Sequence, residues 1–327
     1  MKNLLAILLV FTCTLTQAQD RPAADEAVLP APDTTLCFAH RDTCDLLLDF
    51  YAAAPGRGPC ADSLRKPVVI HVFGGAFLAG RRNRPTDRPW YRELADQGYH
   101  VAAIDYRLGL KGLDLKPNLS AVGALMNAIQ MAVDDLFAAT NYLIDNAEAL
   151  GIDPDRIIVS GSSAGAITAL EAEWEICNRM EPASVLPGWF NYAGIMSFSG
   201  AILSLDGPIN FPQKPCPILL HHGTADKIVP YGRIDIFRKH FAGSDAIAKK
   251  LEAASANFQI LRYAGNGHEI ANLMRHNLPE ELRFLEENVI KGVHRTTDAT
   301  LSDGAIEKPD WGNLQFQNLY DGSVQLQ

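Results

Sequence analysis

The chain has 327 residues, of which 47% are hydrophobic and 20% are charged. This composition supplies enough apolar surface to bury one large core or two ordinary ones, which excludes a globally disordered protein. Its 38 acidic and 29 basic side chains leave a formal net charge of -9. That balance argues against a protein that binds nucleic acid by neutralising phosphates, and it favours small or neutral partners.

The first eighteen residues differ from the rest of the chain. A lysine provides a positive start, residues 4–10 are apolar, and Ala18 ends the stretch with a small side chain. This pattern is typical of a secretory signal peptide. We therefore expect residues 1–18 to be removed and the mature protein to be exported to the periplasm or the extracellular medium. Cys13 raises the alternative of a lipoprotein, which the preceding Thr12 and the short hydrophobic stretch disfavour.

From residue 36 onwards, short runs rich in Val and Ile alternate with segments of helical periodicity. This is the pattern of a mainly parallel sheet covered by helices, so the expected fold class is α/β. In chain order, the expected strands are 36–40, 44–51, 67–72, 100–105, 156–160, 194–202, 217–222 and 258–263. The expected helices are 90–96, 120–149, 164–174, 231–241, 245–256 and 279–290. Only a short turn separates the first two strands, so they are expected to form an antiparallel hairpin at one edge of an eight-stranded sheet.

No linker, composition shift or internal repeat divides the chain after the signal peptide, so we expect residues 19–327 to form a single domain. No stretch beyond the signal peptide approaches the roughly twenty apolar residues of a transmembrane helix. Two irregular segments, 175–192 and 204–214, are expected either to shape a pocket mouth or to be ordinary surface loops. The tail, about residues 296–327, is polar, but its aromatic side chains Trp311, Phe316 and Tyr320 indicate that it packs against the domain.

Residues 161–165 read Gly-Ser-Ser-Ala-Gly and fit the pattern Gly-x-Ser-x-Gly between an expected strand and an expected helix. So sharp a turn needs glycines on both sides, and it exposes the hydroxyl of Ser163 at a helix N-terminus. The sequence therefore predicts Ser163 as a nucleophile. The alternative is a glycine-rich turn in which a serine caps the helix.

A serine nucleophile needs a histidine to take its proton and a carboxylate to orient that histidine. Asp226 follows the strand 217–222 and His268 follows the strand 258–263, so both lie where parallel strands end. We predict them as the catalytic acid and base. For Asp226 the alternative is a turn residue that caps the helix expected from residue 231. Four other histidines lie within strands or at their ends, where core or supporting roles are expected: His71, His100, His221 and His222.

The loop after the third expected strand contains Gly74, Gly75 and Ala76, whose small side chains leave the backbone N–H groups uncovered. Acyl transfer requires such donors for the oxyanion of its tetrahedral intermediate. The N–H of Ala164, the residue after the nucleophile, is expected to complete this oxyanion hole.

Five cysteines remain once the signal peptide is removed, so they cannot all pair. Cys37 and Cys44 lie almost symmetrically about the hairpin turn, and we expect a disulfide between them in an oxidising compartment. Small buried thiols are the alternative for the cysteines. Because no His/Cys spacing is typical of a zinc site, we expect no metal, and we expect no cofactor.

Five arginines follow the expected oxyanion loop on this acidic chain: Arg81, Arg82, Arg84, Arg88 and Arg92. One interpretation is a solvated loop stabilised by acidic neighbours. The other is that one or two of these side chains line the rim of the site and attract an ester that carries a carboxylate, through bidentate guanidinium contacts.

Taken in order, these motifs resemble those of α/β-hydrolases of the carboxylesterase type, and more narrowly those of the feruloyl and acetylxylan esterase-like branch. The segments that carry the resemblance are 74–77, 105–107, 151–156, 161–165, 222–226 and 267–268. The resemblance covers about residues 35–290. It implies the three-layer α/β-hydrolase fold, a triad of Ser163, Asp226 and His268, and oxyanion donors at Gly75, Ala76 and Ala164.

One residue departs from the family pattern, because Phe73 stands where related lipases place a histidine directly before the glycines. His71, two positions earlier, is therefore not assigned that histidine's supporting role. Phe77, Ser162 and Arg81 are the candidate substrate contacts.

The sequence thus predicts a secreted serine esterase that acts on a small-molecule or carbohydrate ester through an acyl-enzyme. Acyl or feruloyl esters of carbohydrates are the narrowest expectation. One alternative is a serine peptidase of the prolyl-oligopeptidase type, although no propeller-like repeats precede the domain. Another is a binding module without catalytic activity, although such modules usually lack a triad residue.

Overall fold

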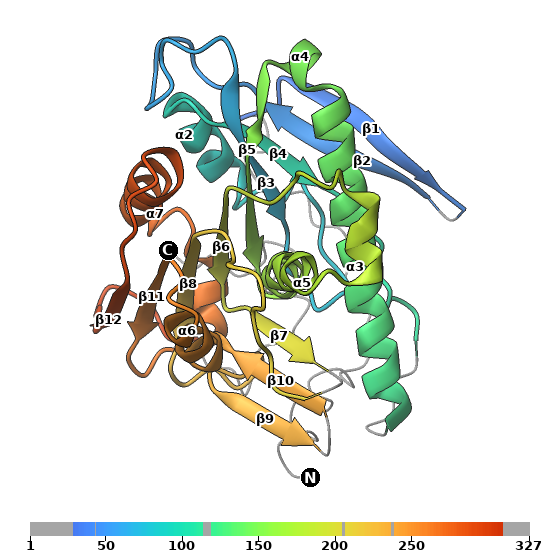
Figure 1. The fold of residues 1–327 in the computed structure, drawn as a ribbon, viewed down its shortest axis with the longest axis vertical. Helices are drawn as coiled ribbons and strands as arrows, with labels where there is room; N and C mark the ends of the chain where they lie inside the picture. Colours follow the sequence, from blue (N-terminus) through green and yellow to red (C-terminus); the bar gives the residue numbers. More distant parts are fainter. Residues whose placement is uncertain (1–28, 43, 114–118, 205–206, 237–238, 310–327) are drawn as a thin grey trace.

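The computed structural model describes residues 29–42, 44–113, 119–204, 207–236 and 239–309 (Figure 1). The expected signal peptide lies outside the described residues, as do the three aromatic side chains expected to pack in the tail.

The main sheet has nine strands in the order β1-β2-β4-β3-β5-β6-β8-β11-β12. Their bounds are β1 Thr34–Arg41, β2 Cys44–Tyr51, β3 Lys66–Val72, β4 His100–Ile104, β5 Ile152–Ser162, β6 Gly194–Phe198, β8 Ile218–Gly223, β11 Phe258–Tyr263 and β12 Thr297–Leu301. β2 is antiparallel to both β1 and β4, and every other neighbouring pair is parallel. The mostly parallel sheet with an antiparallel hairpin at its edge is therefore confirmed.

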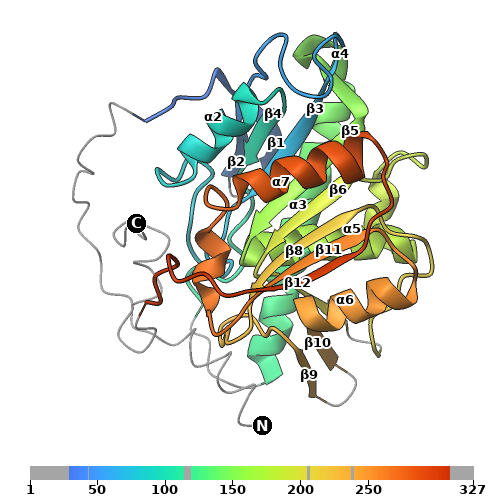
Figure 2. The same cartoon turned by 90° about the vertical axis from the view of Figure 1, so that its left-hand side faces the viewer.

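Helices cover both faces of this sheet and produce three layers (Figure 2). The helical segments are α2 Arg88–Asp96, α3 Leu119–Asp145, α4 Ala147–Leu150, α5 Ala164–Asn178, η3 Glu181–Val185, α6 Ser244–Ala253, η4 His268–Asn272, α7 Leu278–Phe284 and η5 Leu285–Ile290. α2 and α7 pack on one face, where Trp90 and Phe284 belong to the same buried cluster. α3, α5 and α6 pack on the other face. Because both faces are covered, β3, β4 and β6 are buried along their whole length, which explains their mostly apolar sequences.

Part of α3, Ala121–Asp145, is long and apolar enough to cross a membrane by length and composition alone. The sequence interpretation expected no such stretch after the signal peptide. In the structure, 44% of the most apolar window of this helix is buried inside the protein. The helix packs against α5, β1 and β5, and its apolar side chains contribute to the main core.

The helix expected at residues 231–241 is wrong. That segment contains two antiparallel strands instead, β9 Arg233–Ile236 and β10 Lys239–Gly243. β10 also pairs with β7, Ala201–Ser204, which gives a second sheet in the order β7-β10-β9. The sequence of β9, Arg-Ile-Asp-Ile, alternates polar and apolar residues, and this period of two is typical of a strand.

The same small sheet explains why the expected strand 194–202 is divided. β6 ends at Phe198, and the next residue, Ser199, has a φ of 58° that a regular strand does not allow. The chain turns there, so Ala201 begins β7 in the other sheet.

The tail contributes a strand that the sequence interpretation did not include. β12 pairs in parallel with β11 and forms the far edge of the main sheet. Its residues alternate between half-buried and exposed, as expected for an edge strand. Arg262 of β11 donates to both carboxylate oxygens of Asp298 in β12, at 2.6 and 2.8 Å.

The structure contradicts the disulfide expected between Cys37 and Cys44. Cys37 lies opposite Leu47 in the β1–β2 hairpin, whereas Cys44 lies opposite Arg41. The turn joins Arg41 directly to Cys44, so it lies closer to Cys44 than the spacing assumed, and Cys37 is four residues before Arg41 along β1. No disulfide joins any of the five cysteines in the described chain.

Candidate active site

Ser163 lies at the sharp turn between β5 and α5, with a φ of 52° and a ψ of -115°. A serine in this conformation carries strain of about 1–3 kcal/mol, which the surrounding packing must offset. Gly161 and Gly165 make the turn possible. A Cβ atom added at Gly165 would overlap the carbonyl oxygen of Val72. A Cβ atom added at Gly161 would overlap the carbonyl oxygen of Gly165.

The structure brings the three predicted triad residues together from distant parts of the chain. Ser163 Oγ lies 2.8 Å from His268 Nε2, and His268 Nδ1 lies 2.8 Å from Asp226 Oδ2. His268 begins η4 after β11, and Asp226 follows β8, so all three side chains meet where parallel strands end. The three residues are only 2%, 1% and 8% exposed, so the contacts are shielded from water.

Asp226 is held from several sides. Its Oδ1 accepts hydrogen bonds from the backbone N–H groups of Ile228 at 2.8 Å and Val229 at 3.0 Å. The other oxygen, Oδ2, faces two histidines: His268, as above, and His222, whose Nε2 lies 3.4 Å away. Burial alone would raise the pKa of the Asp226 carboxyl, but the two neighbouring histidines outweigh it and hold that pKa well below its usual value. The side chain is therefore a carboxylate at neutral pH. No helix follows for it to cap, because residues 233–236 form β9.

The predicted oxyanion loop follows β3 and has an unusual backbone. Gly75, Ala76 and Phe77 all have positive φ, at 136°, 55° and 60°. Within the described chain, the N–H groups of Gly75, Ala76 and Ala164 donate no backbone hydrogen bond, so they remain available to an oxyanion.

The three candidate substrate contacts occupy different environments. Phe77 is 1% exposed and packs edge-on against Tyr106, with ring centroids 6.1 Å apart. Ser162 is fully buried and donates its hydroxyl to the carbonyl oxygen of Ala271 at 2.6 Å. Its hydroxyl therefore connects the nucleophile turn to η4 instead of facing a substrate. Arg81 is exposed, directly after the oxyanion loop.

Four of the five clustered arginines make structural contacts. Their partners are Asp49 and Asp105 for Arg82, Asp87 for Arg84, the carbonyl oxygens of Leu29 and Pro30 for Arg88, and Asp33 for Arg92. Acidic side chains pair with Arg82, Arg84 and Arg92, as the first interpretation expected. Most contacts of the four are partly or fully buried, however, and Arg88 donates to backbone carbonyls, so the segment is not a solvated loop. Arg81 is the exposed member of the five.

The sequence interpretation missed the residues that hold η4 in place. Arg84, which is 2% exposed, donates to Asn272 Oδ1 at 3.0 Å and so joins the segment after the oxyanion loop to the end of η4. Ser162 holds the same turn through Ala271. Glu269 accepts hydrogen bonds from the Asn266 side-chain amide and from the backbone N–H of Gly267, the two residues before His268. Sequence offers no signal for Arg84, since its partner is 188 residues away.

The remaining strand histidines have supporting roles, as expected. Burial lowers the pKa of His71 to about 4 and that of His221 to about 3, so both rings are neutral. His222 differs because it contacts the candidate triad. Its Nε2 lies 3.2 Å from the Val229 carbonyl oxygen, and its Nδ1 lies 2.7 Å from Ser244 Oγ. The spacing of His222 and Asp226, four residues apart after a strand, was the available signal.

One group of possible metal ligands lies elsewhere in the described chain. Ligand atoms of Cys37, His40 and Asp45 all lie within 4.8 Å of one another on the exposed face of the β1–β2 hairpin. This hairpin forms the edge of the sheet, whereas the candidate triad projects from β5, β8 and β11. The group is therefore not part of the candidate active site.

Comparisons with known families and proteins agree with this architecture. The BD-FAE family matches residues 57–175, and the Phospholipase/Carboxylesterase family matches residues 122–274. A Probable isoprenylcysteine alpha-carbonyl methylesterase ICME from Oryza sativa subsp. japonica is 25% identical over 68% of this chain and 54% of its own length. Fumonisin B1 esterase from Sphingopyxis macrogoltabida is 34% identical over 31% of this chain and 18% of its own length. The chain thus spans about half or less of these curated relatives.

Solved structures resemble nearly the whole described domain. The apo form of Thermogutta terrifontis esterase 2 is 20% identical, with a TM-score of 0.56, over 80% of this chain and 95% of that one. The same esterase phosphorylated by paraoxon is 21% identical, with a TM-score of 0.54, over 78% of this chain and 93% of that one. At these identities the likeness shows the fold. The chain therefore has the α/β-hydrolase fold, and its family matches and the sharp turn at Ser163 make it similar to carboxylesterases.

Proposed function

We propose that this protein is a serine hydrolase that cleaves carboxylic esters through an acyl-enzyme on Ser163. The observation that carries the proposal is the continuous path of 2.8 Å contacts from Ser163 Oγ through His268 to Asp226. An ordinary serine hydroxyl is a poor nucleophile, and a neighbouring base oriented by a carboxylate is what activates it.

In the first half-reaction, Ser163 Oγ attacks the ester carbonyl carbon while His268 Nε2 takes the hydroxyl proton. The carbonyl oxygen becomes an oxyanion, which accepts hydrogen bonds from the N–H groups of Gly75, Ala76 and Ala164. When the intermediate collapses, the bond to the alkoxy group breaks and His268 gives its proton to the departing alcohol. The acyl group remains on Ser163.

In the second half-reaction, water attacks the acyl carbonyl and gives its proton to His268. The new intermediate breaks its bond to Ser163 Oγ, which regains the proton, and the carboxylic acid is released. His268 carries a positive charge in both intermediates, in a nearly waterless site. Asp226, whose lowered pKa keeps it ionised, offsets that charge and fixes the ring so that Nδ1 donates to it.

We also propose that residues 19–327 are exported as a single domain after the signal peptide is removed, and that the substrates are acyl esters of carbohydrates, with feruloyl esters as the narrowest case. The motif resemblance and the BD-FAE match, which spans both the oxyanion loop and the nucleophile turn, support this substrate class. Arg81 is exposed directly after the expected oxyanion loop, and its guanidinium would favour an ester of an acidic sugar.

The decisive experiment is labelling with a fluorophosphonate, followed by peptide mapping and by hydrolysis of nitrophenyl and feruloyl carbohydrate esters. We expect label on Ser163, and we expect Ser163→Ala to lose more than about 10⁴-fold in kcat while remaining folded. Ser163→Ala that still turns over esters would refute the assignment. A folded, unlabelled wild-type protein would instead indicate a binding module, and preferential cleavage of peptides would indicate a peptidase.

A further inference from the structure

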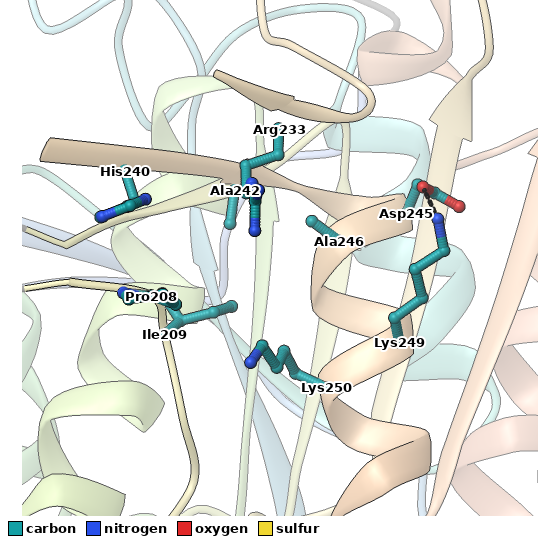
Figure 3. Close-up of a pocket in the computed structure, with 9 residues that line it drawn as sticks. All are labelled: Pro208, Ile209, Arg233, His240, Ala242, Asp245, Ala246, Lys249 and Lys250. Carbon is teal, nitrogen blue, oxygen red and sulfur yellow. Dashed lines mark hydrogen bonds and ion pairs between the residues drawn. The ribbon is translucent and has the colours of Figure 1, made fainter. Parts of the chain in front are cut away.

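A cavity of about 280 Å³ lies beside the small sheet, away from the candidate triad (Figure 3). Its walls come from β9, β10, the first turns of α6 and the segment before β8. Pro208, Ile209, Ala242 and Ala246 supply apolar surface. None of the residues that line it is Ser163, Asp226 or His268.

Two cationic groups point into this cavity from opposite sides. Figure 3 shows the Arg233 guanidinium directed inward from β9 and the Lys250 side chain directed toward Ile209 from α6. Arg233 uses only Nε in its ion pair with Asp235, at 2.9 Å, so both Nη groups keep their hydrogen-bond donors. The Lys250 ammonium group has no ion-pair or hydrogen-bond partner within the described residues.

Asp245, the acidic residue in the lining, is not available to pair with Lys250 or with the Nη groups of Arg233. Asp245 Oδ2 accepts from Lys249 at 2.7 Å, and Asp245 Oδ1 accepts from Arg262 at 2.8 Å. Both oxygens of this carboxylate are therefore engaged by other cations. The cavity thus presents uncommitted donors and net positive charge on a chain whose formal charge is -9.

We propose that this cavity binds a small organic carboxylate with a compact apolar body. The carboxylate accepts hydrogen bonds from Arg233 and Lys250, and the apolar body packs on Ile209 and the alanines. A guanidinium matches a carboxylate with two parallel donors, and such charge-assisted bonds are the strong ones. The volume lies near the lower limit for ligand sites, which restricts the ligand to a small acid.

The test compares benzoate with benzyl alcohol, which has the same ring and no charge, by isothermal titration calorimetry at low salt. The proposed esterase site would also accept an acid, so titrations are run before and after Ser163 is blocked with a phosphonate. The test variant is Lys250→Gln. Lys291→Gln is the matched control, because this lysine is 55% exposed, pairs with Glu286 and does not line the cavity.

We expect blocked wild-type protein to bind benzoate at least about tenfold more tightly than benzyl alcohol, as charged hydrogen bonds imply. Lys250→Gln should remove most of that difference, and Lys291→Gln should change benzoate binding by less than about twofold. Equal binding of the two ligands, or equal effects of the two variants, would overturn the proposal. If the phosphonate does not react, the esterase proposal fails. The comparison of the two lysine variants still decides whether the cavity binds a carboxylate.

Discussion

Asp226 illustrates how single residues in this site depend on their surroundings. Its two oxygens face four N–H groups, from Ile228, Val229, His222 and His268. Hydrogen bonds to the charged form favour ionisation, so the carboxylate persists although it is buried. The charge in turn fixes which nitrogen of His268 carries the proton.

We expect Asp226→Asn to keep the fold and to lower kcat on the order of 10⁴-fold, because an amide nitrogen facing His268 Nδ1 would favour the wrong tautomer. Steady-state kinetics on a nitrophenyl ester would measure the loss. The same chain with His222→Gln should lose far less, since the remaining three donors still hold the carboxylate. Comparable losses in the two variants would contradict the assignment of Asp226 as the acid of the triad.

Three acidic residues on α5, directly after the nucleophile, are buried: Glu171, Glu173 and Glu175. Burial raises the pKa of Glu173 from 4.5 to about 7, although Cys216 N donates to it at 2.8 Å. Its Oε2 has no hydrogen-bond partner in the described structure. Between about pH 4.5 and pH 7, the folded protein therefore holds a proton on Glu173 that the unfolded chain releases.

This proton predicts a pH dependence of stability. Because the folded pKa lies above the unfolded one, the free energy of unfolding should fall as pH rises from about 4.5 to about 7. We expect Glu173→Gln to flatten this fall and to be more stable than the wild type above pH 8, by about 2 kcal/mol. Urea unfolding at several pH values measures the effect. Parallel profiles for the two proteins would show that Glu173 does not titrate in this range.

At the scale of elements, the nucleophile turn depends on close approach of backbones. α5 begins against the end of β3, and Gly165 leaves no space for a side chain there. Gly123 offers the opposite case, since a Cβ atom added to this α3 residue would meet nothing within 4 Å. A glycine-to-alanine substitution therefore tests backbone packing at Gly165 and helix propensity at Gly123.

We expect Gly165→Ala to lower the free energy of unfolding by several kcal/mol or to prevent folding, because the turn must open to relieve the overlap. Gly123→Ala should raise the free energy of unfolding by about 0.5–1 kcal/mol, as for a glycine inside a helix. Denaturant melts of both variants give the comparison. A Gly165→Ala protein as stable as the wild type would mean that the turn is not as tightly packed as the structure shows.

At the scale of the whole molecule, the main sheet runs without interruption from β1 to β12, so each edge is set by its last strand. β12 covers β11, and its segment contributes to a small cluster of Leu261, Tyr263, Ile270 and Ile306. Without β12, the backbone groups of β11 would form an open edge that can pair with another chain.

We expect deletion of residues 297–327 to lower Tm by several degrees, since about 1 kcal/mol corresponds to roughly 2–4 °C in a domain of this size. It should also increase self-association, measured by light scattering. Deletion of residues 310–327 alone keeps β12 and serves as the control. If the two deletions behave alike, β12 contributes nothing to the sheet.

By itself, the sequence determined the fold class, most strands of the main sheet and the three residues of the candidate triad, Ser163, Asp226 and His268. These features depend on local periodicity and on short motifs at strand ends, which neighbouring residues specify directly. Local pattern failed where partners are distant. Residues 231–241 form strands because β10 pairs with β7, about forty residues earlier. Cys37 lies away from Cys44 because the hairpin turn joins Arg41 to Cys44, so that Cys44 sits at the turn itself.

Only the tertiary structure decided how the site is supported and what surrounds it. Ser162 bonds to a carbonyl 109 residues away, Arg84 bonds to a side chain 188 residues away, and Arg233 and Lys250 face one cavity from different elements. The same holds for Glu173, a charged residue whose burial no periodicity indicates. The physical reason is that burial and hydrogen-bond partners depend on which elements pack together, and that follows from the free energy of the whole fold.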